Sequence, residues 1–575
     1  MDNDLNDLII TGKSSNASIV PNENIAFLAV GETVHMSITP TAIESGVVTI
    51  TVQVFDGAFT STTAFALNIT ESPDKSIVSF SIEELSGNDL TNMPITFAQP
   101  FVAGDISNSQ TIKVMTSDQN VLPTQIDKKS LYPDGSLKHG IISFILPEAA
   151  SNEIQTFTLT SARAQTIISD TSLLTDILSN PFDLTVSIHE NNILYQSTLK
   201  QALSQKPIQL WLNGQICKEW HVTGELKDNQ NEIHPHLSPI FYLRAYENST
   251  IVRISVVIEN NYTYQPNPQN FVYDLNISTN NATLFSKTAL THYHHARLRK
   301  IFYLDISNPI TDRTNTLNAC HIAHDIKYLM QSKAVPSYDP QFIHNLSDES
   351  IQAMISAWDS AEKLMNNGLV YYMMNSAAKG PLPQWTAAYL LTMHPELKDI
   401  TLGHGELAGS WPVHFRDKQT QLPVSIIDYP YVSTIWTVKD TYNSETKRYE
   451  NPATCNEGFD CACNLKFAYD SLAYVPYLLT GDYYFLEELQ FNANYGLIVQ
   501  NPGYREEHKG LIKGIYGLQG QSWGLRTLEY CAFITPDNHP LKQYFTDIIR
   551  NNIEYFNNSR DEKKGLLFWV VLFDQ

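Results

Sequence analysis

The hydrophobic pattern of the chain changes its period once, near residue 308. Before that point, runs such as "FDLTVSIHE" and "STIVRISVVIENNYTY" alternate apolar and polar residues, which is typical of strands with one buried face. After it, segments such as "DESIQAMISAWDSAEKLMNNG" repeat their apolar residues with the period of a helix. The 575 residues are also too many for one hydrophobic core. The sequence therefore predicts a multidomain protein, β-rich first and helical afterwards.

Turn-rich stretches divide the chain into three expected units. Residues 1–72 contain alternating runs such as "GVVTITVQVFDG" and predict a small β-sandwich, followed by the linker "ESPDK" at 71–75. A β-rich barrel or sandwich region is expected over residues 76–305. Helical hairpins joined by short turns are expected over residues 306–575, where they close into an α/α toroid or stay an open solenoid.

The charge balance bears on possible partners. The sequence has 38 Lys and Arg against 60 Asp and Glu, a formal net charge of −22, which repels a phosphate backbone and argues against nucleic acid. No apolar run reaches the roughly 20 residues of a membrane-spanning helix, "GLLFWVVLF" near the end included. Only 17% of the residues are charged, and the polar uncharged remainder suits an extracellular protein. We therefore expect a secreted or cell-surface protein, although "MDNDLNDLIITGK" lacks the features of a secretory signal.

Two stretches are rich in cysteine or histidine, residue types that bind metal ions. "CNEGFDCAC" holds three of the six cysteines without the paired Cys-x2-Cys of zinc sites, so a loop disulfide or free thiols are expected there. In "THYHHARLRK" at 291–300, His292 and His294 share a strand face, but no third ligand is evident. We expect no metal and no cofactor; instead, the histidines form a polar interdomain contact and the basic run contacts the acidic helical domain.

The first unit resembles a known kind of repeat. "SSNASIVPNENIAF", "ITPTAIESGVVTITVQVFDG" and "TSTTAFALNIT" are similar to the tandem cadherin-like and immunoglobulin-like repeats of bacterial secreted and surface proteins. A complete repeat of that kind begins some thirty residues earlier, so this copy is expected to be truncated at its N-terminus. The resemblance implies a spacer.

The other two units resemble carbohydrate-active proteins. "LYPDGSLKHGIISF" at 131–144 resembles the barrel domain that precedes the helical domain in rhamnogalacturonan exolyase-like proteins. "PLPQWTAAYLLT", "AGSWPVHFRD" and "GQSWGLRTLEYCAFITPDNHPLKQYF" are similar to uncharacterised bacterial proteins whose helical domain is related to polysaccharide lyase and glycoside hydrolase toroids. The resemblance implies lyase-type β-elimination on an acidic polysaccharide. Tyr469 and Asp470 replace a His and its neighbour in that pattern, a departure that implies loss of activity if the His is essential.

The segment "AGSWPVHFRD" supplies a candidate catalytic pair. Pro412 and the preceding Gly-Ser favour extended backbone, in which His414 and Arg416 share one face. In a lyase, Arg416 would hold the uronate carboxylate and His414 would act as the base, with Trp411 binding substrate. The alternative is structural: Arg416 pairs with Asp417 or a helix C-terminus, and His414 is a satisfied donor.

The segment "GQSWGLRTLEY" supplies a candidate substrate wall. On a helix Trp523, Arg526 and Tyr530 lie on one side, where the rings stack on sugars, Arg526 binds a carboxylate and Gln521 adds a polar contact. Tyr474, in "SLAYVPYLLTG", is a third catalytic candidate, as the acid or base of an elimination. The alternative for all these aromatic residues is ordinary packing between helices.

Neighbouring residues are expected to be structural. Gly481 and Asp482 predict the end of one helix and the cap of the next, His404 lies on an apolar helical face, and Pro540 fits the first turn of a helix. The sequence leaves three functions open: a polysaccharide lyase, a glycoside hydrolase that uses carboxylates such as Glu487 and Glu488, and a non-catalytic carbohydrate-binding or adhesive surface protein. It also leaves the oligomeric state open.

Overall fold

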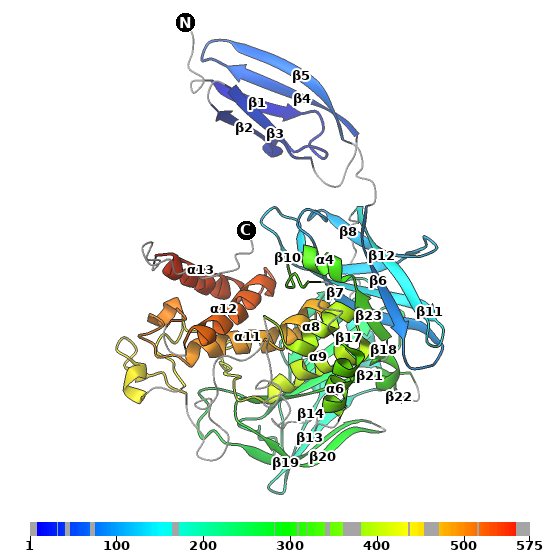
Figure 1. Ribbon diagram of the computed structural model, residues 1–575, viewed down its shortest axis with the longest axis vertical. Helices are drawn as coiled ribbons and strands as arrows, with labels where there is room; N and C mark the ends of the chain where they lie inside the picture. Colours follow the sequence, from blue (N-terminus) through cyan, green and yellow to red (C-terminus); the bar gives the residue numbers. More distant parts are fainter. Residues whose placement is uncertain are drawn as a thin grey trace.

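The computed structural model begins with a small unit of two sheets (Figure 1). One sheet has the order β1-β4-β5 (Ile9–Ser14, Gly46–Phe55, Thr60–Ile69), and β2 (Ile25–Val30) pairs with β3 (Thr33–Ile38) in the other. A small core of Ile19, Val20, Ile25, Val48 and Ile50 lies in this unit. The structure describes residues 8–30, 33–40, 46–69, 75–163, 172–280, 282–307, 310–318, 320–339, 346–359, 381–434, 437–452, 471–513 and 517–558.

The next unit is built from two antiparallel sheets around a core rich in phenylalanine. The three-stranded sheet has the order β10-β11-β7 (Thr124–Leu131, Leu137–Ala149, Leu90–Pro100). The five-stranded sheet has the order β23-β6-β12-β8-β9 (Cys320–His324, Ser76–Glu84, Ile154–Arg163, Gln110–Thr116, Val121–Leu122). Because β23 returns to pair with β6, this sheet is completed by residues beyond 305, where the sequence pattern placed the end of the β region.

A third β unit is inserted between β12 and β23. Its six-stranded sheet has the order β15-β16-β17-β18-β21-β22 (Gln209–Asn213, Cys217–Thr223, Ser238–Tyr246, Ile251–Asn260, Ala296–Asp305, Thr311–Asp312). A four-stranded sheet, β14-β13-β19-β20 (Ile193–Thr198, Leu184–Glu190, Phe271–Thr279, Thr283–His292), shares one apolar core with it. Four short helices accompany these two β units: α1 (Ser172–Ser179), α2 (Leu199–Gln205), α3 (Thr314–Asn318) and α4 (Ile326–Gln331).

Both faces of the six-stranded sheet are buried, and they differ in chemistry. Successive side chains of a strand point to opposite faces, so Val252, Ile254 and their alternate neighbours enter the apolar core. The other face carries Arg253 and Glu259 from β18, and β21 adds two further arginines, all of them buried. A charged face of this kind requires a partner layer with opposite charges.

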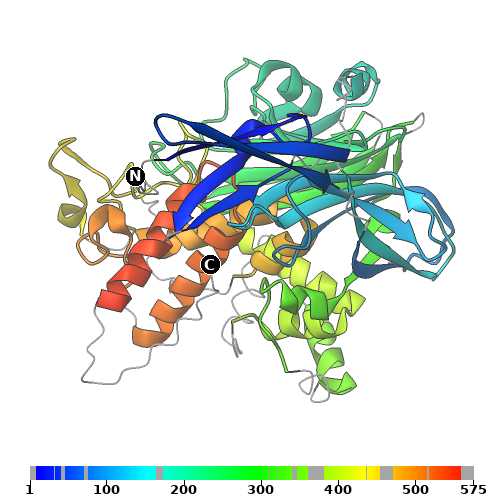
Figure 2. The same ribbon diagram turned by 90° about the horizontal axis from the view of Figure 1, so that it is seen from above.

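Helices supply that layer (Figures 1 and 2). α11 (Tyr483–Ile498) is buried along almost its whole length, and its carboxylates pair with Arg297 of β21. α12 (Gly517–Ile534) contacts α11, and α13 (Lys542–Asn558) contacts α12. The remaining elements of this region are α6 (Asp348–Asp359), α8 (Gln384–Thr392), α9 (Pro395–Leu407), α10 (Tyr474–Thr480) and the small strands β24 (Tyr442–Asn443) and β25 (Arg448–Tyr449).

Several local expectations can be compared with these elements. Gly481 ends α10 with φ +66°, and the Asp482 side chain caps α11 by accepting a hydrogen bond from the Tyr484 amide at 3.2 Å, so both cap predictions are confirmed. Pro540 was expected in the first turn of a helix, but α13 begins at Lys542, so that prediction is wrong by two residues. Among the described helices, none is long and apolar enough to cross a membrane. The segments "CNEGFDCAC" and "GLLFWVVLF", and residues Tyr469 and Asp470, lie outside the described residues.

Candidate functional site

His414 and Arg416 lie in a buried ion-pair cluster between the charged sheet face and α11. Arg416 binds Glu259 on β18, with Nε–Oε2 2.7 Å, and Glu487 on α11, with Nη2–Oε1 3.0 Å. His414 Nε2 lies 2.7 Å from Glu488 Oε2. Two residues of one short segment thus bind two neighbouring glutamates of α11: Arg416 binds Glu487, and His414 binds Glu488.

Arg297 of β21 links the same carboxylates. Its three guanidinium nitrogens lie 2.6 Å from Glu259 Oε1, 2.7 Å from Glu487 Oε2 and 2.7 Å from Glu488 Oε1. Tyr242 on β17 also donates a hydrogen bond to Glu487 at 2.8 Å. Burial alone would raise the pKa of Glu487, but Arg416 and Arg297 outweigh burial and lower this pKa to about 2. Glu487 is therefore ionised at neutral pH and is a poor general acid.

The geometry around "AGSWPVHFRD" differs from a cleft wall. His414 is 0% and Arg416 2% exposed, and both face buried carboxylates rather than an open cleft. The alternative pairing of Arg416 with Asp417 does not occur: Asp417 Oδ2 instead accepts a hydrogen bond from Tyr429 at 3.0 Å. Trp411 is also buried and belongs to the large core of the helical region. This geometry makes His414 and Arg416 links between the sheet and α11, while a catalytic role for either stays a prediction.

The basic run on β21 contacts the helical region, as its sequence predicts. Arg297 and Arg299 pair with acidic residues of the helical region, and Arg299 shares Asp482 with Arg253, so the predicted contact of this run with the acidic helices is confirmed. His295 stacks on Phe415, with ring centroids 3.8 Å apart, which confirms the histidine-rich stretch as an interdomain contact. Among the described residues, no group of three or more potential ligands is arranged to hold a metal ion.

His404 is a core histidine, as its apolar helical face predicted. Its ring stacks on Trp385 at 4.4 Å and lies 4.9 Å from the ring of Trp358. Its Nδ1 contacts the Ile400 carbonyl oxygen at 2.6 Å. Burial lowers the pKa of His404 to about 4, so the ring is neutral at physiological pH.

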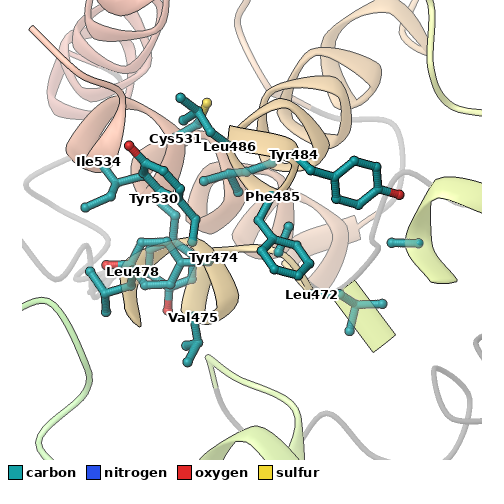
Figure 3. Packing of buried hydrophobic residues seen from close by; sticks show 14 of the residues in the cluster. Leu472, Tyr474, Val475, Leu478, Tyr484, Phe485, Leu486, Tyr530, Cys531 and Ile534 are labelled. Atoms are coloured by element: carbon teal, nitrogen blue, oxygen red, sulfur yellow. The ribbon is translucent and has the colours of Figure 1, made fainter. Parts of the chain in front are cut away.

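Tyr474 and Tyr530 are brought together by α10 and α12 (Figure 3). Their rings stack in parallel, with centroids 3.9 Å apart and planes inclined by 6°. The Tyr474 hydroxyl donates a hydrogen bond to the Ala334 carbonyl at 2.6 Å, and its ring is 1% exposed. Tyr474 therefore supports the position of Tyr530, which lies closer to the surface at 6% exposure.

α12 also carries the other predicted binding residues. Gln521, Trp523 and Arg526 are half-buried, as are Leu525 and Ala532 of the other predicted face, whereas Leu528 is fully buried. Arg526 acts electrostatically on Tyr530: burial raises the pKa of Tyr530 to about 12, and Arg526 offsets part of that rise.

Sequence reasoning missed one further residue of α12, Glu529. Glu529 is half-buried, and burial raises the pKa of its carboxyl to about 7. Its negative charge also acts on Tyr530. The available signal was the spacing, since Arg526, Glu529 and Tyr530 are three and four residues apart and therefore neighbours on a helix. We refer to Trp523, Arg526, Glu529 and Tyr530 as the α12 site.

The "LYPDGSLKHG" motif of the barrel contacts the helices that carry the α12 site. The Leu131 amide donates a hydrogen bond to Asp537 Oδ2 at 2.7 Å, and His139 Nε2 lies 3.0 Å from the Leu478 carbonyl oxygen. The Lys138 ammonium lies 4.7 Å from the ring centroid of Phe533. The motif thus joins the β10–β11 hairpin to the helical layer.

Comparison with known proteins gives one family match. Residues 79–161 match the family described as "PcRGLX-like N-terminal RIFT barrel domain". The matched residues include the motif at 131–144. The unit formed by the β10-β11-β7 and β23-β6-β12-β8-β9 sheets therefore contains a RIFT barrel domain, in a β-rich multidomain chain with additional helices. No curated protein matches the chain.

Two solved structures from Enterococcus faecalis show partial similarity. One is a protein in the glycosyl hydrolase family 38, with 11% identity and a TM-score of 0.22 over 35% of this chain and 32% of that chain. The other is an alpha-mannosidase from strain V583, with 9% identity and a TM-score of 0.20 over 35% of this chain and 31% of that chain. The chain thus matches about a third of the length of each protein, and TM-scores this low do not establish a shared fold.

Proposed function

We propose that the protein acts on an acidic polysaccharide by β-elimination at the α12 site. The observation that carries this proposal is the match of residues 79–161 to the PcRGLX-like barrel. The motif at 131–144 within that match resembles rhamnogalacturonan exolyase-like proteins, and it contacts the helices next to the α12 site. The α12 site then provides the residue types that such a reaction needs.

Each residue of the α12 site has a role in this reaction. Trp523 stacks on a sugar ring, and Arg526 binds the uronate carboxylate and stabilises the charge that builds up as the neighbouring carbon loses its proton. Glu529, with a pKa of about 7, accepts that proton. The carbon–oxygen bond to the leaving sugar then breaks, a carbon–carbon double bond forms, and the leaving oxygen takes up a proton. In this proposal Tyr530 donates it.

The wider organisation is inferred from the same resemblance. We infer that the helices belong to an α/α toroid, that residues 1–72 are a cadherin-like or immunoglobulin-like spacer, and that the protein is secreted or displayed on a bacterial surface. In this proposal His414 and Arg416 position α11 on the sheet, and Tyr474 positions Tyr530.

The test is a turnover assay on rhamnogalacturonan and other acidic polysaccharides. We expect products that absorb in the ultraviolet because of the new double bond, at a rate that rises with pH through about 7 as Glu529 loses its proton. Glu529→Gln should lower this rate at least about 100-fold. Glu554→Gln, which changes an exposed glutamate of α13, is the matched control. Reducing sugar without absorbance would establish a hydrolase instead, and binding without turnover an adhesive protein.

A further inference from the structure

A cavity of about 550 Å³ lies between the charged sheet face and the helices, apart from the α12 site. Its lining comes from strands β7, β17, β18, β21 and β23 and from helices α3, α6, α8, α9, α10 and α11. The volume lies within the roughly 300–1,000 Å³ of small-molecule sites. We call this space the arginine cavity, after Arg244, Arg253 and Arg299, which line it.

The charged groups around the cavity leave positive charge in excess. Asp482 is shared by Arg253 and Arg299, and Glu219 pairs with Arg244 at 2.5 Å. Arg299 Nη1 also lies 3.6 Å from Glu406, too far for a hydrogen bond. The ionisable residues that line the cavity are five cationic and three acidic: Arg244, Arg253, Arg299, Lys300, Lys398, Asp399, Glu406 and Asp482.

Three guanidinium groups carry unused donors. Arg244 is 4%, Arg253 5% and Arg299 5% exposed, yet Arg244 Nη2, Arg253 Nη1 and Arg299 Nη1 have no hydrogen-bond partner within the described residues. Leaving a charged donor buried and unpaired is costly, and such groups in native proteins call for an explanation. A ligand with an oxyanion would satisfy them, because guanidinium groups bind carboxylates with two parallel hydrogen bonds.

Other residues of the cavity lining suit the rest of a sugar. His324 Nε2 donates to the Ala98 carbonyl at 3.0 Å, which leaves Nδ1 as a free acceptor on a fully buried ring that lines the cavity. A sugar hydroxyl can donate to that nitrogen. Trp358 and Tyr389 also line the cavity and provide aromatic surface for a pyranose ring.

We propose that the arginine cavity binds a uronic acid sugar, with its carboxylate on Arg244 and Arg253 and a hydroxyl on His324. That the cavity binds an oxyanion is inferred from its unpaired guanidinium donors alone. That the oxyanion belongs to a sugar rests on the proposed function. The cavity would then hold an acidic unit of the substrate or product away from the α12 site.

The test is calorimetric titration of the full chain with D-galacturonate, with D-galactose as the matched ligand that lacks the carboxylate. We expect galacturonate to bind and galactose to bind at least tenfold more weakly. Arg253→Lys keeps a charge for Asp482 but removes the planar guanidinium group, and should weaken galacturonate binding at least tenfold. Arg448→Lys, an exposed arginine of β25, should bind as the parent does. Equal binding of both sugars, or undiminished binding by Arg253→Lys, would overturn the proposal.

Three further measurements separate the possible failures. Arg526→Lys should lose turnover and any galacturonate binding at the α12 site, but keep the binding that Arg253→Lys removes; if it abolishes binding while Arg253→Lys keeps it, the sugar occupies the α12 site alone and the cavity proposal is wrong. If no polysaccharide is cleaved but Arg253→Lys still loses binding, the cavity stands and the proposed function fails. Inorganic phosphate that binds as tightly as galacturonate would overturn the sugar assignment. In the parent protein, galacturonate but not galactose should slow amide exchange in α9, and unchanged exchange would also contradict the proposal.

Discussion

The candidate site residues fall into two kinds: some are buried and join the sheet to the helices, and others are partly exposed to solvent. Arg416 and Trp523 represent the two kinds: the first is 2% exposed within a network of carboxylates, and the second is half-buried on α12. Both were predicted from sequence as site residues. Residue type, with the alternation of an extended segment for Arg416 and helical spacing for Trp523, was enough to select them. It was not enough to distinguish burial from access, because the carboxylates that bury Arg416 come from distant parts of the chain.

Arg416→Met should lower the free energy of unfolding by about 3–5 kcal/mol, because it leaves Glu259 and Glu487 with one fewer buried cation. Chemical denaturation measures this loss. Arg550→Met, which removes an exposed pair with Asp547, should cost less than about 0.5 kcal/mol. If Arg416→Met instead kept its stability and lost only turnover, the catalytic role predicted from the sequence would be supported.

Trp523→Ala should weaken oligosaccharide binding by about 1–3 kcal/mol, the scale of losing one large aromatic contact. Titration with an acidic oligosaccharide measures the change, and the melting temperature should stay within a few degrees of the parent. The control is Tyr442→Ala, an exposed aromatic residue of β24. A collapse in melting temperature with unchanged binding would show that Trp523 is a core residue.

At the scale of elements, the junction between α10 and α11 shows what local sequence can specify. Gly481 and Asp482 were identified as caps from residue type alone, and the structure confirms both. The sequence could not reveal that Asp482 also binds Arg253 and Arg299, since those arginines lie about 180 to 230 positions earlier. Cap chemistry is local and therefore readable, whereas the pairing of a strand face with a helix depends on the fold.

The same junction gives a test on two glycines. A Cβ at Gly481 would lie 2.5 Å from the Ile141 side chain, at a φ of +66° that other residues rarely adopt. Gly481→Ala should therefore destabilise the protein by about 2 kcal/mol or more. Gly496, within α11, has open space around the same position, so Gly496→Ala should stabilise by about 0.5–1 kcal/mol. Equal effects in denaturation would contradict this account of the junction.

At the scale of the whole molecule, buried histidines couple stability to pH. Burial lowers the pKa to about 4 for His139, His292, His324, His404 and His539. In the unfolded chain these groups titrate near pH 6.5, so their contribution is complete above about pH 6.5 and is lost as the pH falls toward 4. Glu219 and Glu487, each with a pKa of about 2, add a second loss between about pH 4 and 2.

We therefore expect the denaturation midpoint to fall steeply between pH 6.5 and 4. His404→Phe should make this fall less steep, because the new ring retains the contacts with Trp358 and Trp385 but cannot be protonated. His35→Gln, at an exposed position in β3, provides the control. If the denaturation midpoint does not change between pH 6.5 and 4, the buried histidines do not couple stability to pH.

The first unit offers a test of modularity. It has its own small core, which shares no residue with the other three cores of the described chain. Deleting residues 1–72 should therefore leave sugar binding and turnover by the remaining chain unchanged. Lost activity in a variant that is still folded would reject the role of this unit as a spacer.

The two unlike faces of the six-stranded sheet also have a consequence for synthesis on the ribosome. The apolar face is covered by strands that emerge early, so the sandwich can collapse while the helices are still being made. The arginines then stay hydrated until α11 arrives, about 190 residues after β21. Glu219 and Glu259 of the sheet pair with part of this charge, and α11 then adds Glu487 and Glu488, which complete the pairing of Arg297. We therefore expect this face of the sheet to become fully buried only after α11 has been made.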